Sequence, residues 1–208
     1  EVNLSNTEIE TETGMLEKYS VSKGNFVDSV KNIENIKTTK YDDYVVGSNF
    51  KNVIETFEGD DYIVNSSKNN TIDGGEGKDT IDYTNSQKAI VVDDINDNNT
   101  FEVKKGLETD TIKNIEHFKG TQFNDELTVN ENSTKDYIFE TGKGDDIVKG
   151  GSGSDTIYFG EGNDIVIGSK GRDIYDGEAG IDTIDYSKST KDLEVDMKET
   201  KGTLKEEG

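Results

Sequence analysis

An apolar residue recurs at every ninth position from residue 141 to residue 185. This stretch divides into five units, TGKGDDIVK, GGSGSDTIY, FGEGNDIVI, GSKGRDIYD and GEAGIDTID, each with glycine at position four and aspartate at position six. Position eight is apolar or aromatic in every unit: Val148, Ile157, Val166, Tyr175 and Ile184. Each unit therefore predicts a glycine turn, one acidic residue and a three-residue strand with one inward side chain. A polar linker would not keep this period.

A second, less regular block lies at residues 38–82. Its units are TTKYDDYVV, GSNFKNVIE, TFEGDDYIV, NSSKNNTID and GGEGKDTID, and position eight is again always Val or Ile. Because a three-residue strand is not stable alone, stability in both blocks must come from stacking successive units, which aligns the position-eight side chains. Position six of this block alternates between acid and amide: Asp43, Asn52, Asp61, Asn70 and Asp79.

A longer repeat connects the two blocks. Residues 82–94 match 185–197, residues 27–47 match 109–129, and EVNL at the start echoes EVDM at 194–197. The chain thus starts and stops near the same point of this longer repeat, as a piece of a longer array would. We expect five segments: a spacer at 1–37, a first roll at 38–82, a spacer at 83–130, a second roll at 131–185, and the start of another spacer at 186–208.

The spacer at 83–130 is harder to assign. We expect strands and a polar loop over 83–119, although the spacing of Ile112, Ile115 and Phe118 also suits a short helix. Residues 131–139 are similar to a degenerate nonapeptide with Asp136 at position six and Ile138 at position eight.

The composition restricts the partners. The 208 residues carry a formal net charge of -22 and only 29% are hydrophobic, so the chain needs a source of stability beyond a core. Such a polyanion disfavours nucleic acid and anionic membranes as partners and favours cations. No apolar run is long enough for a membrane-spanning helix, no signal-peptide pattern is present at the start, and direct membrane insertion is not expected. With no Cys and a single His117, the available ligands are hard oxygens, which suit Ca²⁺ or Mg²⁺.

The nonapeptide GGxGxDxUx, carried by residues 141–185, resembles the repeat of the RTX (repeats-in-toxin) family. The resemblance implies an all-β fold, a right-handed parallel β-roll (β-solenoid), here with two nonapeptide blocks joined by a strand and loop spacer. It also implies calcium ions between each turn and the turn two units later, held by aspartates and turn carbonyls.

Applied to this chain, the resemblance assigns calcium sites to alternate units. Asp146, Asp164 and Asp182 fall on one edge of the second roll, and Asp155 and Asp173 fall on the other. The implied sites are 146 with 164, 164 with 182 and 155 with 173, plus 61 with 79 and, less strongly, 43 with 61 in the first roll. The amides of Asn52 and Asn70 are expected to form a ladder without metal. The turn glycines assigned to these sites are Gly142, Gly144, Gly151, Gly153, Gly160, Gly162, Gly171, Gly180, Gly59 and Gly77.

Other chemistry has weaker support. Asp94, Asn96 and Asn98 imitate the start of an EF-hand loop, but Asn99 and Lys105 stand where that loop needs Gly and Glu, so we interpret the segment as a polar loop. No HExxH, GxSxG or phosphate-binding GKS/T motif occurs, and we expect no enzymatic activity from this segment.

The resulting hypothesis is a calcium-binding segment of a larger secreted or surface bacterial protein, exported by type I secretion. It would fold outside the cell and act as an adhesin stalk or S-layer element beside neighbouring repeats of its parent chain. The alternative is the C-terminal secretion and folding domain of an RTX exoenzyme or pore-forming toxin. No residue indicates a particular glycan or protein receptor.

Overall fold

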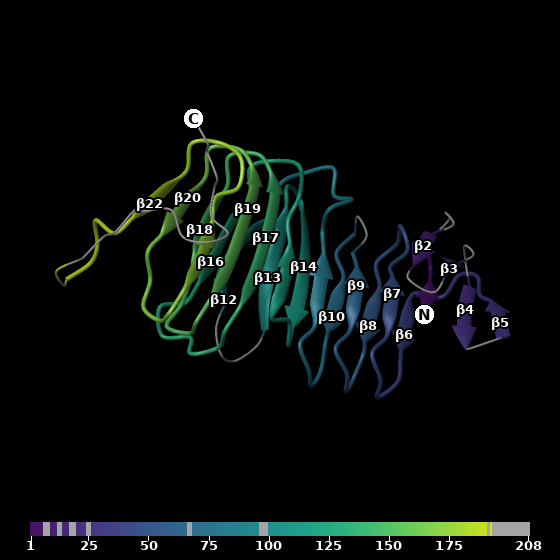
Figure 1. Ribbon diagram of the computed structural model, residues 1–208. Helices are drawn as coiled ribbons and strands as arrows, with labels where there is room; N and C mark the ends of the chain where they lie inside the picture. Colours follow the sequence, from purple (N-terminus) through teal and green to yellow (C-terminus); the bar gives the residue numbers. More distant parts are fainter. Residues whose placement is uncertain are drawn as a thin grey trace.

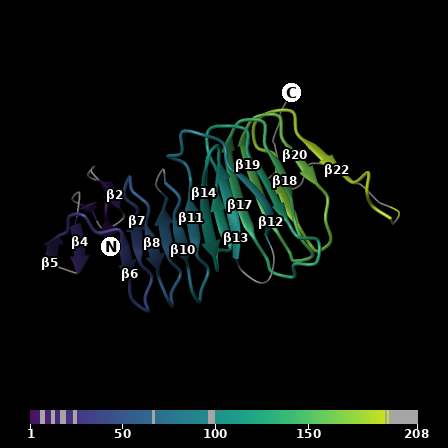
Figure 2. The same ribbon diagram turned by 180° about the vertical axis from the view of Figure 1, so that it is seen from behind.

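The computed structural model describes residues 1–5, 9–11, 14–16, 20–23, 26–65, 68–95, 100–190 and 192. Their regular secondary structure is entirely β: two ten-stranded sheets run the length of an elongated molecule, and a small hairpin lies near the N-terminus (Figures 1 and 2). Within the described residues no helix is present that could cross a bilayer. The expected all-β solenoid is confirmed.

Each nonapeptide contributes one short strand, and successive strands alternate between the two sheets. Sheet 1 contains, in spatial order, β21 (Ile174–Asp176), β19 (Thr156–Glu161), β17 (Ile138–Lys143), β15 (His117–Lys119), β11 (Thr80–Asp82), β9 (Tyr62–Val64), β7 (Tyr44–Val46), β1 (Val2–Asn3), β4 (Ser20–Lys23) and β5 (Phe26–Ser29). Sheet 2 contains β22 (Thr183–Asp185), β20 (Ile165–Ile167), β18 (Ile147–Lys149), β16 (Glu126–Val129), β12 (Val91–Ile95), β13 (Thr100–Lys105), β14 (Glu108–Lys113), β10 (Thr71–Asp73), β8 (Val53–Glu55) and β6 (Asn35–Lys37). The separate hairpin is β2 (Ile9–Thr11) with β3 (Gly14–Leu16).

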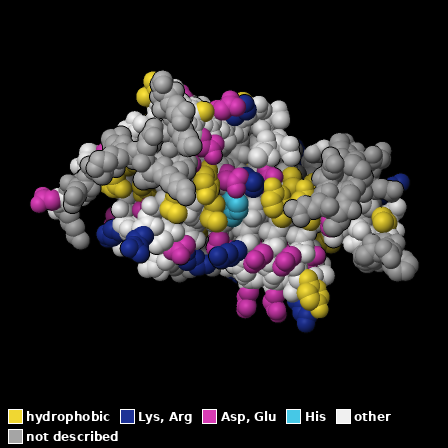
Figure 3. Space-filling view, viewed as in Figure 1, with side chains coloured by type: hydrophobic (Ala, Val, Ile, Leu, Met, Phe, Trp, Pro, Cys, Tyr) yellow, Lys and Arg dark blue, Asp and Glu magenta, His cyan; other side chains and the backbone are white. Residues whose placement is uncertain are grey.

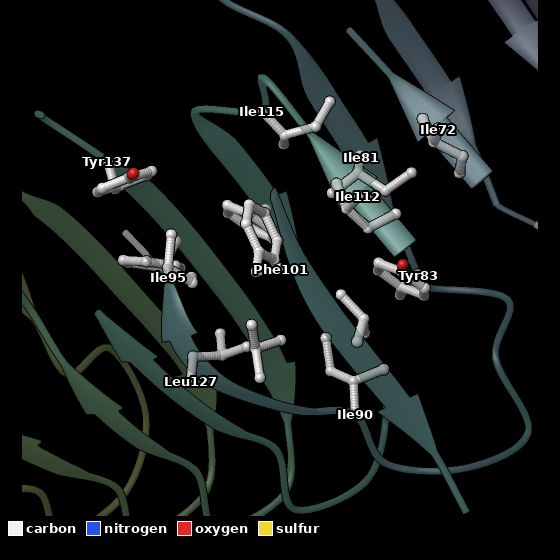
Figure 4. Packing of buried hydrophobic residues seen from close by; sticks show 14 of the residues in the cluster. Ile72, Ile81, Tyr83, Ile90, Ile95, Phe101, Ile112, Ile115, Leu127 and Tyr137 are labelled. Carbon is white, nitrogen blue, oxygen red and sulfur yellow. The ribbon is translucent and has the colours of Figure 1, made fainter. Parts of the chain in front are cut away.

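The position-eight side chains form the core between the sheets. In sheet 1, Ile63 pairs in parallel with Val45 and Ile81, and in sheet 2 Val148 pairs with Leu127 and Val166. These side chains are at most 2% exposed, and they belong to one buried cluster that continues through the spacer (Figure 4). The apolar seam expected from the nine-residue period is therefore real, and the two blocks share it.

The spacer extends the sheets rather than separating them. After β12 the chain forms an antiparallel meander through β13 and β14, and β15 then returns to sheet 1 between β11 and β17. Ile112 and Phe118 lie in β14 and β15, so the helical alternative for this segment is wrong. Pairing with the neighbouring parallel strands decides the conformation, which periodicity alone left open.

The degenerate unit before residue 141 has a different register from the one expected. Phe139 pairs with Ile157, and Ile138 pairs with Thr156. Phe139 therefore occupies position eight, and Tyr137 rather than Asp136 occupies position six. The strand register requires the large apolar ring at the buried position, where Phe139 is fully buried.

Candidate calcium-binding turns

The position-six side chains form two ladders, one for each sheet. Each ladder runs along the turns that precede the strands of that sheet. In each ladder an oxygen of the side chain accepts the backbone N–H of the position-six residue one coil earlier. The Asp146 amide donates to Asp164 Oδ1 at 2.7 Å, and the Asp61 amide donates to Asp79 Oδ1 at 2.9 Å. The same contact joins Asp155 to Asp173 at 3.0 Å.

The ladder along sheet 2 brings together Asp146, Asp164 and Asp182, as the sequence predicts. The ladder along sheet 1 contains both Asp43, Asp61 and Asp79 from the first block and Asp155 and Asp173 from the second. The nine-residue period alone predicts the acidic edges of each block separately. The continuous sheets place their acidic edges on a common side.

The turns themselves fall into two classes. In the first class, which we call open turns, positions two and four both have positive φ: Gly160 has +98° and Gly162 has +156°. A side chain at Gly162 would collide with the carbonyl oxygen of Gly144, the equivalent glycine one coil earlier. Glycine is thus required where successive backbones approach closely. The open turns begin the units at 56, 74, 141, 159 and 177.

In the second class, which we call closed turns, the residue at position two caps the position-six side chain. The Gly151 amide donates to Asp155 Oδ2 at 3.0 Å, and the Thr39 amide donates to Asp43 Oδ2 at 2.9 Å. Asp173 Oδ2 receives the hydroxyls of Ser169 and Tyr175 at 3.1 and 2.8 Å. The second carboxylate oxygen of these aspartates is therefore already used.

Four of the five open turns leave the second carboxylate oxygen buried without a donor. Oδ2 of Asp61, Asp79, Asp146 and Asp164 is buried and has no hydrogen-bond partner, and each of these side chains is at most 1% exposed. The nearby Thr56 hydroxyl does not donate to Asp61, because it donates its proton to the Gly74 carbonyl at 2.7 Å. A buried carboxylate oxygen with no donor needs either a proton or a cation.

The electrostatics of the open turns agree with this requirement. Burial is the largest cause raising the pKa of Asp61 to about 6 and the pKa of Asp79 and Asp146 to about 7. Burial and the charge of Asp182 also raise the pKa of Asp164. Each carboxylate is thus destabilised in the ionised form that would bind a metal.

Asp110 shows how the same fold neutralises a buried acid with protein groups. It occupies position six before β14 and accepts the Asn70 amide at 2.7 Å. Its other oxygen lies 2.7 Å from Lys105 Nζ and accepts the hydroxyl of Tyr83 at 3.0 Å. None of the four open-turn oxygens described above has such a partner.

The amide edge of the first block is a hydrogen-bonded ladder, as expected. The backbone N–H of Asn52 donates to Asn70 Oδ1 at 2.8 Å, and Asn52 Oδ1 accepts the backbone N–H of Ser48 at 2.8 Å. Both asparagines are buried. Neutral amides stack here without charge repulsion.

Besides Asp110, the nonapeptide spacing also did not identify Asp125, Glu116 and Tyr137 as position-six residues. Asp125 accepts the Thr121 amide at 2.6 Å and donates its own amide to Asp146 Oδ1 at 2.7 Å. Glu116 accepts the Asp79 amide at 3.2 Å, and Tyr137 donates its amide to Asp155 at 2.9 Å. The signal for Asp125 was present, because the match of 27–47 with 109–129 aligns it with Asp43.

Side chains alone do not complete a metal site. Among the described residues, no group of three or more His, Asp or Glu side chains is close enough to hold an ion. Any ion between open turns therefore needs backbone carbonyls, which are hard ligands suited to calcium. The EF-hand imitation cannot be placed, because residues 96–99 lie outside the described part of the chain.

The repeats match a known family. The RTX calcium-binding nonapeptide repeat model matches in four copies, over residues 38–67, 66–85, 138–166 and 160–184. The chain belongs to the RTX repeat family. Comparison with curated proteins gives no match. Among solved structures, this RTX chain is similar to the crystal structure of extracellular lipase LipA from Serratia marcescens, with 17% identity and a TM-score of 0.37. The match covers 70% of this chain and 29% of the lipase chain, so the RTX segment spans less than a third of that protein.

Proposed function

We propose that the open turns bind calcium ions, and that this binding makes folding of the segment possible. The observation that carries the proposal is the set of four buried carboxylate oxygens without a donor, on Asp61, Asp79, Asp146 and Asp164. Asp61 and Asp79 lie in open turns one coil apart in the same ladder, and so do Asp146 and Asp164. Membership of the RTX family supports the choice of calcium.

The remaining sites would differ in strength. Asp182 is exposed at the end of the second roll, so a 164 with 182 site is less enclosed. The site at 155 with 173, and that at 43 with 61, would require the ion to compete with hydrogen bonds from Gly151, Ser169, Tyr175 or Thr39. We expect these closed-turn sites to bind more weakly than the two pairs of open turns.

Calcium would then act as a switch between compartments. At neutral pH the metal-free carboxylates oppose the stacking that creates the core, so a chain in low calcium stays unfolded and suits export. Extracellular modules bind calcium at about 10⁻⁴ to 10⁻³ M, so a chain at the cell surface or in the medium would be loaded and folded. In this setting the segment would act as a structural stalk or S-layer element.

The experiment is a calcium titration followed by far-ultraviolet circular dichroism. The metal-free chain at neutral pH should give a disordered spectrum and should convert cooperatively to a β spectrum at submillimolar to millimolar calcium. Magnesium at the same concentrations is the control and should convert it far less. A chain with full β structure in the absence of divalent ions would refute the proposal.

A further inference from the structure

Inside the molecule, two strands of the first roll pair with two strands of the spacer, and we call this contact the interior junction. Strands with matching sequences lie at the two ends of the molecule. At this junction the last two strands of the first roll meet the segment that follows: β10 pairs in parallel with β14 in sheet 2, and β11 pairs in parallel with β15 in sheet 1. In this register Ile72 lies opposite Ile112, and Ile81 lies opposite Phe118.

The first half of the junction recurs at the C-terminal end. The match of residues 82–94 with 185–197 places β22 as the counterpart of β11, and both strands read Thr-Ile-Asp. The same offset places β21 as the counterpart of β10. Whereas β10 and β11 are covered, β21 and β22 are the last strands of their sheets among the described residues.

The second half recurs at the N-terminal end. The match of residues 27–47 with 109–129 places β5 as the counterpart of β14 and β6 as the counterpart of β15. These strands end the two sheets on the opposite side of the molecule (Figure 1). Sheet 1 thus runs from β21 to β5 and sheet 2 from β22 to β6, so both sheets carry complementary ends.

The two ends expose side chains that the interior junction buries. Ile184 is 52% exposed, whereas its counterpart Ile81 is fully buried; Ile33 is 43% exposed, whereas its counterpart Ile115 is 2% exposed. A hollow of about 360 Å³ opens at the N-terminal end, lined by the apolar side chains of Leu4, Val30, Ile33 and Phe50 and by polar residues that include Lys31 and Glu34. Exposed apolar groups at a sheet edge are a template for pairing with another chain.

The charges at the ends are also complementary. In the interior junction Asp73 and Lys113 form an ion pair at 3.0 Å across β10 and β14. Their counterparts are Asp176 at the C-terminal end and Lys31 at the N-terminal end. On the other strand pair, Asp82 opposite Lys119 corresponds to Asp185 opposite Lys37.

We propose that two copies of this chain stack head to tail, the β21 and β22 end of one copy pairing in parallel with the β5 and β6 end of the next. The register copies the interior junction, so that Tyr175 lies opposite Val30 and Ile184 lies opposite Ile36. Both sheets and the apolar seam then continue through the interface. Because the contact joins different surfaces and does not close, further copies add in the same direction.

Disulfide trapping tests the orientation and register, since the chain has no cysteine of its own. Lys37→Cys and Asp185→Cys are separate single variants at positions that the proposal places directly opposite, within the separation that a disulfide spans. When mixed in millimolar calcium and oxidised, they should form the mixed dimer several-fold faster than either variant forms a dimer alone. The control mixture contains Asp185→Cys and Lys88→Cys, whose cysteine lies on the spacer surface. This mixture should not form the mixed dimer.

A charge exchange gives an independent readout by sedimentation. Asp176→Lys and Lys31→Asp should each weaken association about fivefold, and the double variant should recover most of the loss. Circular dichroism confirms that each variant is folded, so a failure of calcium-dependent folding is distinguished from a failure to associate. A folded chain that stays monomeric at about 1 mM, or mixed cysteines that react no faster than the Lys88 control, would overturn the proposal.

Discussion

At the scale of single residues, position six has one geometry and several chemical solutions. In Asp164, Asn70 and Glu116 alike, the side chain accepts a backbone N–H from the neighbouring coil. The difference lies in the remaining polar atom. Asn70 Nδ2 donates to Asn65 Oδ1 at 2.8 Å, the second oxygen of Asp155 accepts the Gly151 amide, and Asp164 Oδ2 has no donor. The residue type and the turn class together decide whether an ion is needed.

This difference predicts unequal effects of two matched substitutions. Asp164→Asn removes a carboxylate shared by the proposed sites with Asp146 and Asp182, so the calcium stoichiometry should fall by two. When the free calcium concentration is about tenfold above the dissociation constant of each site, losing both ions lowers the calcium-dependent stability by about 3 kcal/mol. Asp155→Asn should remove at most one weaker ion. Isothermal titration calorimetry and thermal melts in calcium measure both quantities, and equal effects of the two variants would contradict the assignment.

At the scale of the elements, turns and strands are stabilised by different forces. The strands are joined by the backbone ladder and by the buried seam, which includes Ile63 and Val148. On the face shown in Figure 3, acidic and basic side chains are interspersed. Lys143 pairs with Glu161 across neighbouring coils at 2.6 Å. Such exposed pairs add little stability. The open turns instead stack buried acids on acids, so they are the element most sensitive to protons and metal.

The stability of the metal-free chain should therefore increase on acidification. The ordinary pKa of an aspartate is 3.8, and burial in the folded chain raises the pKa to about 6 for Asp61 and to about 7 for Asp79 and Asp146. Folding thus takes up protons: this contribution to stability is complete below pH 3.8 and disappears as the pH rises through 6 to 7.

Far-ultraviolet circular dichroism of the metal-free chain between about pH 4 and pH 8 measures this dependence. The β signal should be largest at the acidic end and should be lost as the pH rises toward neutrality. The calcium-loaded chain is the control, and its melting temperature should rise with pH instead, because protons displace calcium from its ligands. A metal-free β signal that is constant or rises with pH would contradict the account of the open turns.

At the scale of the whole molecule, the sequence predicts the solenoid but underestimates its continuity. The nine-residue period correctly places the buried seam, since every position-eight side chain of the first block is buried. The same period is interrupted by three residues after Thr128, where the unit of Asp125 is followed by that of Tyr137. Counting from either block alone therefore loses the register, and only the pairing of β15 and β16 with their neighbours restores it.

The sequence predicts which aspartates occupy the candidate sites, but not which of these sites should bind calcium more strongly. The spacing identified Asp61, Asp79, Asp146 and Asp164 as one kind of residue with Asp155 and Asp173. Whether the second oxygen is capped depends on the backbone of the turn, and glycine at position four occurs in both turn classes. Gly162 lies in an open turn and Gly153 in a closed one, so the motif alone does not separate them.

The most direct test of the central claim is to locate calcium in crystals grown at millimolar calcium, using anomalous scattering. We predict ion density between Asp61 and Asp79 and between Asp146 and Asp164, in contact with the carboxylate oxygens that lack a donor. Density at these four carboxylates should be stronger than any beside Asp155 and Asp173. Ordered open turns without an ion at either pair would contradict the claim that calcium completes this fold.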